Sequence, residues 1–429
     1  MVMLMANPRK LAARTLLKIE KDSAYSNITL ASVFGENELT KEDKKLVSAL
    51  VYGVLDRKIT LDWVLSRFMK TPVNKTAPFT LQVLRSALFQ IMFMDKIPES
   101  AAVNEAVKLI KNSKESRNAG FVNGVLRSIL RADKLLPLDS SAESLSIRYS
   151  CPLNIVNSFI EDYGTDNAVS LLEESLKAPP TVLRVNTLKT DRDILLSKLG
   201  DYNIECEKGE TENSVILKKG TDIPSNPLYK EGLFHIQDLA SQKAVSILSP
   251  NEGERILDIC AAPGGKSFTM AELMGNMGEV IACDLYEHRC SLIKASAKRL
   301  GIDIIKTYVS DATKKNTELG SFNAVLCDVP CSGLGVIRRK PEIKYKPIED
   351  FTDLENIQYK ILENASGYLK SGGRILYSTC TLRKGENERI IEKFLSNHKD
   401  FSKEYEHTFM PHTDNTDGFY CSLLIKTER

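Results

Sequence analysis

Hydrophobic positions change their spacing twice along the chain, and each change marks an expected domain boundary. In residues 1–135 apolar side chains recur every three or four positions, for example between Leu46 and Leu55, which predicts helices throughout. Pro72, Pro78 and Pro98 stand between these stretches, where proline ends or begins helices. We therefore expect an all-α domain over residues 1–135.

Residues 136–236 combine helical and strand-like patterns. A helical stretch reaches Lys177 and is broken by Pro179 and Pro180. A small helical plus α/β module of this kind, RRM-like in outline, can bind RNA or act as a spacer, and the pattern does not choose between them. The further elements expected here are a strand at 181–185, a helix at 191–199 and strands at 214–216 and 233–236.

Residues 237–429 alternate between apolar runs and helix-length segments. This alternation predicts a parallel, doubly wound, Rossmann-like sheet, because parallel neighbours need a crossover connection. The five expected strands lie at 255–259, 279–283, 304–309, 324–327 and 374–377.

Composition narrows the class of protein. The chain of 429 residues has no apolar run of the ~20 residues that a membrane span needs. Its nine cysteines lack paired CxxC spacing, which argues against a zinc site and favours a reducing, cytoplasmic location. Residues 1–134 carry 22 Lys and Arg against 13 Asp and Glu, although the whole chain has a net charge of only +2. This basic third is either a polyanion-binding module or a solvated helix surface, with equal weight.

Polar groups follow all five expected strands. Asp258, Asp284, Asp311 and Asp328 stand at or just beyond the first four, and Ser378-Thr379-Cys380 closes the fifth. In an open parallel sheet, ligands bind outside the carboxyl ends of the strands. A single aspartate there is more often a helix N-cap, but five polar ends at one edge indicate a site.

A glycine-rich turn after the first strand indicates the ligand. Gly265-Lys266-Ser267 resembles the end of a P-loop, but Cys260 replaces the leading glycine and Pro263 lacks an amide. Asp284 follows at a distance that suits a ribose hydroxyl. An adenosine ligand without pyrophosphate, such as S-adenosylmethionine, therefore fits better than NAD or a nucleoside triphosphate, and a P-loop NTPase remains a distant alternative. The turn is Cys260-Ala261-Ala262-Pro263-Gly264-Gly265-Lys266.

Two cysteines lie just past the fourth and fifth strands. Cys331 and Cys380 stand in polar turns, whereas Cys283, Cys290 and Cys327 lie in apolar runs or a helix typical of buried thiols. A methyl donor beside two thiols suggests methylation of C5 of a pyrimidine. One thiolate adds to C6, which makes C5 nucleophilic, and a general base then removes the C5 proton. From the residues alone, either thiol could be the nucleophile.

Two further groups belong to this hypothesis. Asp328 could hydrogen-bond the edge of the base and neutralise charge that develops on the ring. Arg338-Arg339-Lys340, Lys344 and Lys346 form a basic loop downstream, which we interpret as a phosphate contact.

Several motifs resemble the Sun/Nop family of RNA cytosine-5 methyltransferases. The N-terminal third is similar to NusB-like RNA-binding domains, and the resemblance covers nearly the whole chain. The catalytic motifs are Gly232 to Ser241, Ile259 to Lys266, Asp328-Val329-Pro330-Cys331-Ser332-Gly333, Ser378-Thr379-Cys380-Thr381 and Asp417-Gly418-Phe419-Tyr420. The NusB-like motifs are Arg85 to Gln90, Ala102 to Val107 and Phe121 to Arg127.

The resemblance implies a role for each site residue. It makes Cys380 the nucleophile, Cys331 the residue that releases product, and Asp328 a contact to cytosine. Asp284 would bind ribose and Asp311 the adenine end of S-adenosylmethionine. The remaining implied cofactor contacts are Cys260, Ala261, Ala262, Pro263, Gly264, Gly265, Lys266 and again Asp328.

The resemblance also implies the partners. The substrate would be 16S rRNA in the small subunit or its assembly intermediates, bound by a monomer without metal or membrane. Thr381 stands where family members often have serine, a change that leaves the thiol untouched. The alternatives are an RNA-binding, antitermination-type factor with an inactive methyltransferase fold, or a cytosine-5 methyltransferase acting on another RNA. A zinc deaminase is ruled out because the H-x-E and P-C-x-x-C patterns are missing.

Overall fold

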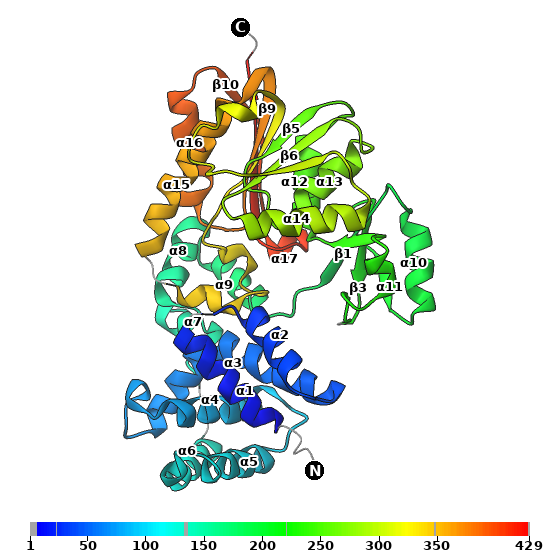
Figure 1. The fold of residues 1–429 in the computed structure, drawn as a ribbon. Helices are drawn as coiled ribbons and strands as arrows, with labels where there is room; N and C mark the ends of the chain where they lie inside the picture. Colours follow the sequence, from blue (N-terminus) through cyan, green and yellow to red (C-terminus); the bar gives the residue numbers. More distant parts are fainter. Residues whose placement is uncertain (1–6, 23, 133–135, 220, 347–348, 428–429) are drawn as a thin grey trace. The chain divides into compact units, whose positions relative to one another are not determined.

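The computed structural model describes residues 7–427 except 23, 133–135, 220 and 347–348. The chain forms two compact units (Figure 1). One comprises residues 1–177 together with 337–346, and the other comprises 178–336 and 347–429. The three sequence ranges proposed above remain a prediction, and the expected boundary at residue 135 falls outside the described residues. In the described part of the chain, no helix combines the length and apolarity that crossing a membrane requires.

The first unit is helical, as the apolar spacing predicts. The prolines act as expected, since α4 begins at Pro78 and Pro98 immediately precedes α5. Its α-helices are α1 (Pro8–Asp22), α2 (Ser26–Glu36), α3 (Lys41–Phe68), α4 (Pro78–Phe93), α5 (Glu99–Lys111), α6 (Ala119–Leu130), α7 (Ala142–Tyr149), α8 (Leu153–Tyr163) and α9 (Thr165–Glu174).

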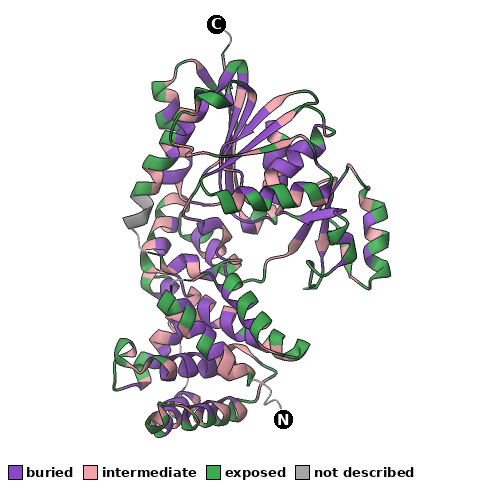
Figure 2. Cartoon of the chain, in the orientation of Figure 1, coloured by how far each residue is buried: buried purple, intermediate pink, exposed green. Residues whose placement is uncertain are grey.

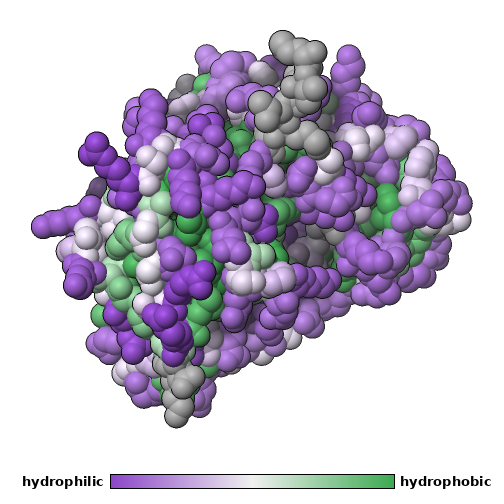
Figure 3. Space-filling model, turned by 90° about the horizontal axis from the view of Figure 1, so that it is seen from below, coloured by the Kyte–Doolittle hydropathy of each residue, from purple (hydrophilic) through white to green (hydrophobic). Residues whose placement is uncertain are grey.

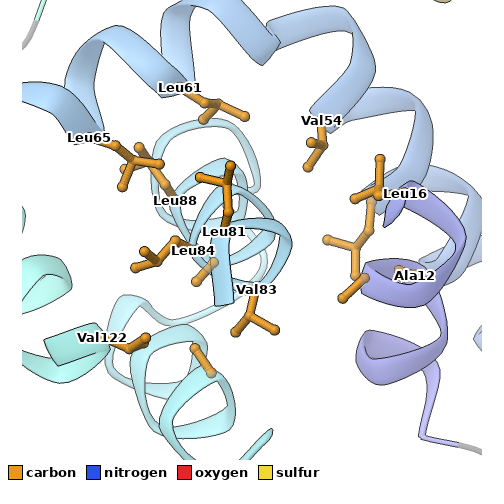
Figure 4. Packing of buried hydrophobic residues seen from close by; sticks show 14 of the residues in the cluster. Ala12, Leu16, Val54, Leu61, Leu65, Leu81, Val83, Leu84, Leu88 and Val122 are labelled. Atoms are coloured by element: carbon orange, nitrogen blue, oxygen red, sulfur yellow. The ribbon is translucent and has the colours of Figure 1, made fainter. Parts of the chain in front are cut away.

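Helix α4 lies at the centre of this unit and packs against α1, α3, α5 and α6. Leu84 and Leu88 of α4 are fully buried in one cluster with Leu61 and Leu65 of α3, and Leu88 lies beside Leu65 (Figure 4). Leu16 of α1 joins the same cluster from the other side. Burial of each such leucine stabilises the fold by roughly 1.5–3 kcal/mol, so this cluster holds the N-terminal helices together.

The second unit opens with a small antiparallel sheet. Its strand order is β2-β3-β1-β4, and α10 (Arg192–Asp201) and α11 (Pro227–Lys230) accompany it. The expected strands are confirmed, and the short edge strand β2 was not foreseen. The strands are β1 (Thr181–Val185), β2 (Cys206–Lys208), β3 (Ser214–Leu217) and β4 (Phe234–Ile236).

The larger sheet has seven strands in the order β10-β11-β9-β8-β5-β6-β7. The first five strands in sequence are parallel, as predicted, but β11 runs antiparallel to β9 and β10 antiparallel to β11. The last two strands were not predicted, and β10 and β11 pair antiparallel because the connection after Phe409 is too short for a crossover. The strands are β5 (Arg255–Asp258), β6 (Glu279–Asp284), β7 (Ile305–Val309), β8 (Phe322–Asp328), β9 (Leu369–Thr379), β10 (Phe401–Phe409) and β11 (Phe419–Lys426).

Helices cover both faces of the large sheet, so its central strands are buried (Figure 2). Helices α12 (Leu239–Leu248), α13 (Gly265–Leu273) and α14 (Glu287–Leu300) pack on one face. Helices α15 (Glu349–Ser366) and α16 (Glu388–Asn397) pack on the other. On the face of the molecule drawn in Figure 3, hydrophilic side chains predominate and hydrophobic ones show between them.

Candidate active site

Two neighbouring strands bring the two sequence motifs together. Strands β8 and β9 are parallel neighbours, and their register pairs Asp328 with Ser378. The Ser378 hydroxyl donates a 2.9 Å hydrogen bond to Asp328 Oδ1. Beyond the strands, the hydroxyls of Ser332 and Thr381 lie 2.7 Å apart and link the two loops. The loops that carry the two cysteines are therefore held side by side.

The two sulfur atoms lie 3.2 Å apart, within hydrogen-bond distance for sulfur. The hydrogen bond to Cys380, burial and the nearby Glu386 carboxylate raise the pKa of the Cys331 thiol well above its usual value. Either sulfur can donate in this contact, so the two thiols share one hydrogen bond.

A lysine whose side chain is only 13% exposed stands beside this pair. Lys266 Nζ donates a 2.7 Å hydrogen bond to Asp328 Oδ2. Burial alone would lower the pKa of Lys266, but the Asp328 carboxylate, with further help from Cys380 and Asp258, raises it overall. Lys266 belongs to the glycine-rich turn in sequence, yet its ammonium group lies with Asp328 and supplies positive charge near Cys380.

The glycine-rich turn connects β5 to α13. Gly264 has φ 106°, in the left-handed region, and its amide donates to Ala261 O at 2.8 Å. Beneath the turn, Ser267 Oγ donates to Asp258 Oδ2 at 2.6 Å. Burial raises the pKa of Asp258 to about 7, although that hydrogen bond lowers it. Asp258 is therefore a buried support of the turn.

The next two aspartates have local partners. Asp284, at the end of β6, is buried, forms a 3.0 Å ion pair with Arg289 and accepts from the Tyr286 amide. Asp311 lies two residues beyond β7 and accepts from both the amide and the hydroxyl of Thr313, which lower its pKa. The exposed apolar side chains that flank this edge of the sheet are Leu285, Tyr286, Tyr308 and Val309.

The interpretation of Lys344 as a phosphate contact is wrong. Its side chain is only 1% exposed, and Nζ donates to the backbone oxygen of Asp56 at 2.9 Å within the helical unit. Glu342, in the same segment, accepts from the amide and hydroxyl of Ser26. A buried ammonium group needs such a partner, so it is withheld from solvent and RNA. Lys340 and Lys346 are exposed, and a phosphate contact through them stays a prediction.

Sequence reasoning missed three polar residues around the thiols. Gln358, Glu386 and Asn387 are fully buried, and each hydrogen-bonds to a residue next to a cysteine or to its loop. No motif in the neighbouring sequence marks these three residues, and only the fold shows that they lie around the same two cysteines.

The strand order, with a glycine-rich turn after the first parallel strand and β11 antiparallel beside β9, is that of a methyltransferase. Residues 245–425 match the family model described as 16S rRNA methyltransferase RsmB/F. Residues 6–131 match the NusB family, and residues 151–224 match the ferredoxin-like domain of RsmF/B-like methyltransferases. The chain belongs to the RsmB/F family of 16S rRNA methyltransferases. The helical NusB-like part and the Rossmann-like part expected from the sequence are thereby confirmed, and the small α/β module expected between them is a ferredoxin-like domain.

Individual relatives extend over the full chain. It is 39% identical to the "Probable ribosomal RNA small subunit methyltransferase B" of Bacillus subtilis (strain 168), covering 97% of this chain and 98% of that protein. The crystal structure of PH0851 superposes with a TM-score of 0.83 at 25% identity, over 99% of this chain and all of that one. A methyltransferase homolog from Pyrococcus horikoshii gives 0.60 at 26% identity, over 67% of this chain and 100% of that one.

Proposed function

We propose that this protein transfers a methyl group from S-adenosylmethionine to C5 of one cytosine in 16S rRNA, through a covalent bond between Cys380 and C6. The observation that carries this proposal is the pair of sulfurs 3.2 Å apart, beside the Asp328–Lys266 ion pair. The name of the Bacillus subtilis relative, a probable ribosomal RNA small subunit methyltransferase B, supports the choice of small-subunit rRNA.

Cys380 starts the reaction as a thiolate. The Cys331 thiol donates to it, and the Lys266 ammonium group lies close enough to stabilise its negative charge. Its Sγ adds to C6, and the electrons of the C5–C6 double bond then make C5 nucleophilic. Asp328 accepts hydrogen bonds at the edge of the base, and Lys266 offsets the charge that develops on the ring.

Cys331 completes the reaction after Cys380 has become a thioether. The largest cause of its raised pKa, the hydrogen bond to Cys380, is then lost. Its pKa falls, so its proton can pass to solvent and the resulting thiolate can take the proton from C5. The C5–C6 double bond re-forms, the C6–S bond breaks, and Cys380 returns as a thiolate.

The residues at the sheet edge fit the cofactor. The turn at Gly264 lets a ligand approach the backbone, and Asp284 offers a carboxylate for ribose hydroxyls beside the exposed Leu285 and Tyr286. Lys266 pairs with Asp328 and Arg289 with Asp284, so these cations are not arranged to hold a pyrophosphate. When bound, S-adenosylmethionine supplies an electrophilic methyl group. Asp311 and the turn residues 260–265 complete the proposed contacts.

A direct assay tests this function. Purified protein is incubated with unmodified small-subunit rRNA and S-adenosylmethionine labelled in its methyl group, and the RNA is digested to nucleosides. We expect label in 5-methylcytidine at one position of 16S rRNA. Label in a different RNA would give the enzyme another substrate, and RNA binding without any methylation would favour the antitermination-type alternative.

Replacing Gly264 by alanine is expected to weaken S-adenosylhomocysteine binding by about tenfold or more. A Cβ at Gly264 would lie 2.5 Å from the Phe268 ring, and its positive φ adds strain of about 1–3 kcal/mol. Calorimetric titration measures the loss. Gly253→Ala is the matched control, since Gly253 also has a positive φ but has open space around it. Equal affinities for the two variants would remove the turn from the cofactor site.

A further inference from the structure

Three buried polar side chains surround the cysteine loops without belonging to the reacting groups. Glu386 ends a short 3₁₀ segment (Lys384–Glu386) after β9, Asn387 follows it, and Gln358 comes from α15. All three are fully buried. A buried carboxylate and two buried amides cost stability unless their hydrogen bonds are made, so their partners indicate what they do.

Two of them grip the backbone on both sides of Cys331. The Gln358 amide donates to Pro330 O at 2.9 Å, immediately before the cysteine. The Ser332 amide, immediately after it, donates to Glu386 Oε2 at 2.8 Å. The same Gln358 amide also donates to Glu386 Oε2 at 2.9 Å, which joins the two contacts into one clamp.

The next residue does the same for Cys380. The Thr379 hydroxyl donates to Asn387 Oδ1 at 2.6 Å, and Asn387 Nδ2 donates to Thr381 O at 3.0 Å. Thr379 and Thr381 are the two neighbours of the cysteine. Adjacent positions of one short segment, Glu386 and Asn387, therefore fix the two thiol loops separately.

We propose that Glu386 and Asn387, with Gln358, are positioning residues that set the two thiols for separate steps. The Gln358–Glu386 pair orients Cys331 for removal of the C5 proton, and Asn387 orients Cys380 for addition to C6. This division of labour rests on the function proposed above. It predicts that removing the Gln358–Glu386 contacts slows the loss of the C5 proton, whereas removing the Asn387 contacts slows the addition to C6.

The kinetic test compares Gln358→Met with Asn387→Ala on 16S rRNA. Gln358→Met keeps the side-chain volume but removes the amide. We expect its first round of methyl transfer to stay within about threefold of normal while turnover falls roughly ten- to hundredfold. Methylated RNA then accumulates as a denaturant-resistant adduct. Asn387→Ala should slow adduct formation and methyl transfer together by a similar factor, without accumulation.

Conservative and matched variants separate positioning from mere stability. Glu386→Gln can keep an oxygen toward both Ser332 and Gln358 but loses the ion pair with Arg383, so it should release product faster than Glu386→Leu, which should trap the adduct. Asn186→Leu is the structural control, because Asn186 is a buried amide that donates to Gly232 O before β4 and to Leu300 O at the end of α14. It should lower the melting temperature without trapping RNA.

Hydrogen–deuterium exchange of the protein alone tests the clamp without RNA. In Gln358→Met the Ser332 amide should exchange with deuterium at least tenfold faster than in the unaltered protein, because its acceptor loses a partner. Normal exchange together with normal turnover would overturn the clamp. The clamp would also be overturned if every variant, including Asn186→Leu, slowed methyl transfer and product release by the same factor. If exchange responds but the unaltered protein methylates no cytosine, the proposed function fails while the clamp stands.

Discussion

Replacing Cys331 by alanine is expected to trap 16S rRNA on the protein as an adduct that survives denaturation. In the proposed mechanism Cys380 can still add to C6 and C5 can still be methylated, but the variant lacks the thiol proposed to take the C5 proton. Turnover should fall by at least about two orders of magnitude, the usual loss for a general base. A denaturing gel of protein, rRNA and S-adenosylmethionine shows the adduct as a slow band.

Cys380→Ala is the matched control because it removes the other sulfur of the same 3.2 Å pair. It should give no slow band and no methylated RNA. A band from Cys380→Ala and none from Cys331→Ala would exchange the two roles. No band from either variant, with no methylation by the unaltered protein, would leave RNA binding as the function.

Replacing Arg184 by methionine is expected to destabilise the second unit by about 3–5 kcal/mol, because it leaves a buried carboxylate unpaired. Arg184 of β1 is 3% exposed, and its Nε donates to Glu272 Oε2 of α13 at 3.0 Å. His235 of β4 lies against the same carboxylate, with Nδ1 3.5 Å from Oε1. Thermal and chemical unfolding measure the loss. The double variant Arg184→Met with Glu272→Leu should recover most of it.

The effect should depend on pH through Glu272. Burial raises the pKa of this carboxyl from 4.5 to about 7, although Arg184 lowers it. The folded state then binds more protons than the unfolded state between these values, so stability falls as pH rises through that window. Without Arg184 the pKa of Glu272 rises further, so the loss should grow by about 1 kcal/mol between about pH 5 and about pH 8. His235 stays neutral across this range, since burial lowers its pKa to about 3. A loss independent of pH would mean that packing, not charge, explains it.

Periodicity alone predicted the helices of the first unit and the five parallel strands. Apolar runs such as Arg255–Ile259 are too short for helices and are bounded by turn residues, which favours strands. The pattern did not reveal β10 and β11. Strand β10 alternates weakly and carries exposed charges such as Lys403 and Glu404, so its pattern resembles a polar segment.

The sequence singles out residues whose motif is contiguous and misses residues that converge only in the fold. Cys380 directly follows β9 and Cys331 lies three residues past β8, and the sheet brings the two thiols together. Gln358 reaches its partner from a different helix, so no local spacing announces it. The phosphate contact predicted for Lys344 was wrong because a lysine is normally solvated. Only the tertiary structure shows that its ammonium group donates to the backbone oxygen of Asp56.

Residues 337–346 belong to the helical unit although the chain reaches them only after β8 has been made. During synthesis on the ribosome, the N-terminal helices therefore emerge long before the segment that supplies Ile343 and Lys344 to their interior. The helical unit reaches its final packing only after residues 337–346, and Cys331 before them, have been translated. The N-terminal helices therefore cannot complete their packing until this part of the C-terminal half has been made. A fragment that stops at residue 177 would lack the buried residues Ile343 and Lys344.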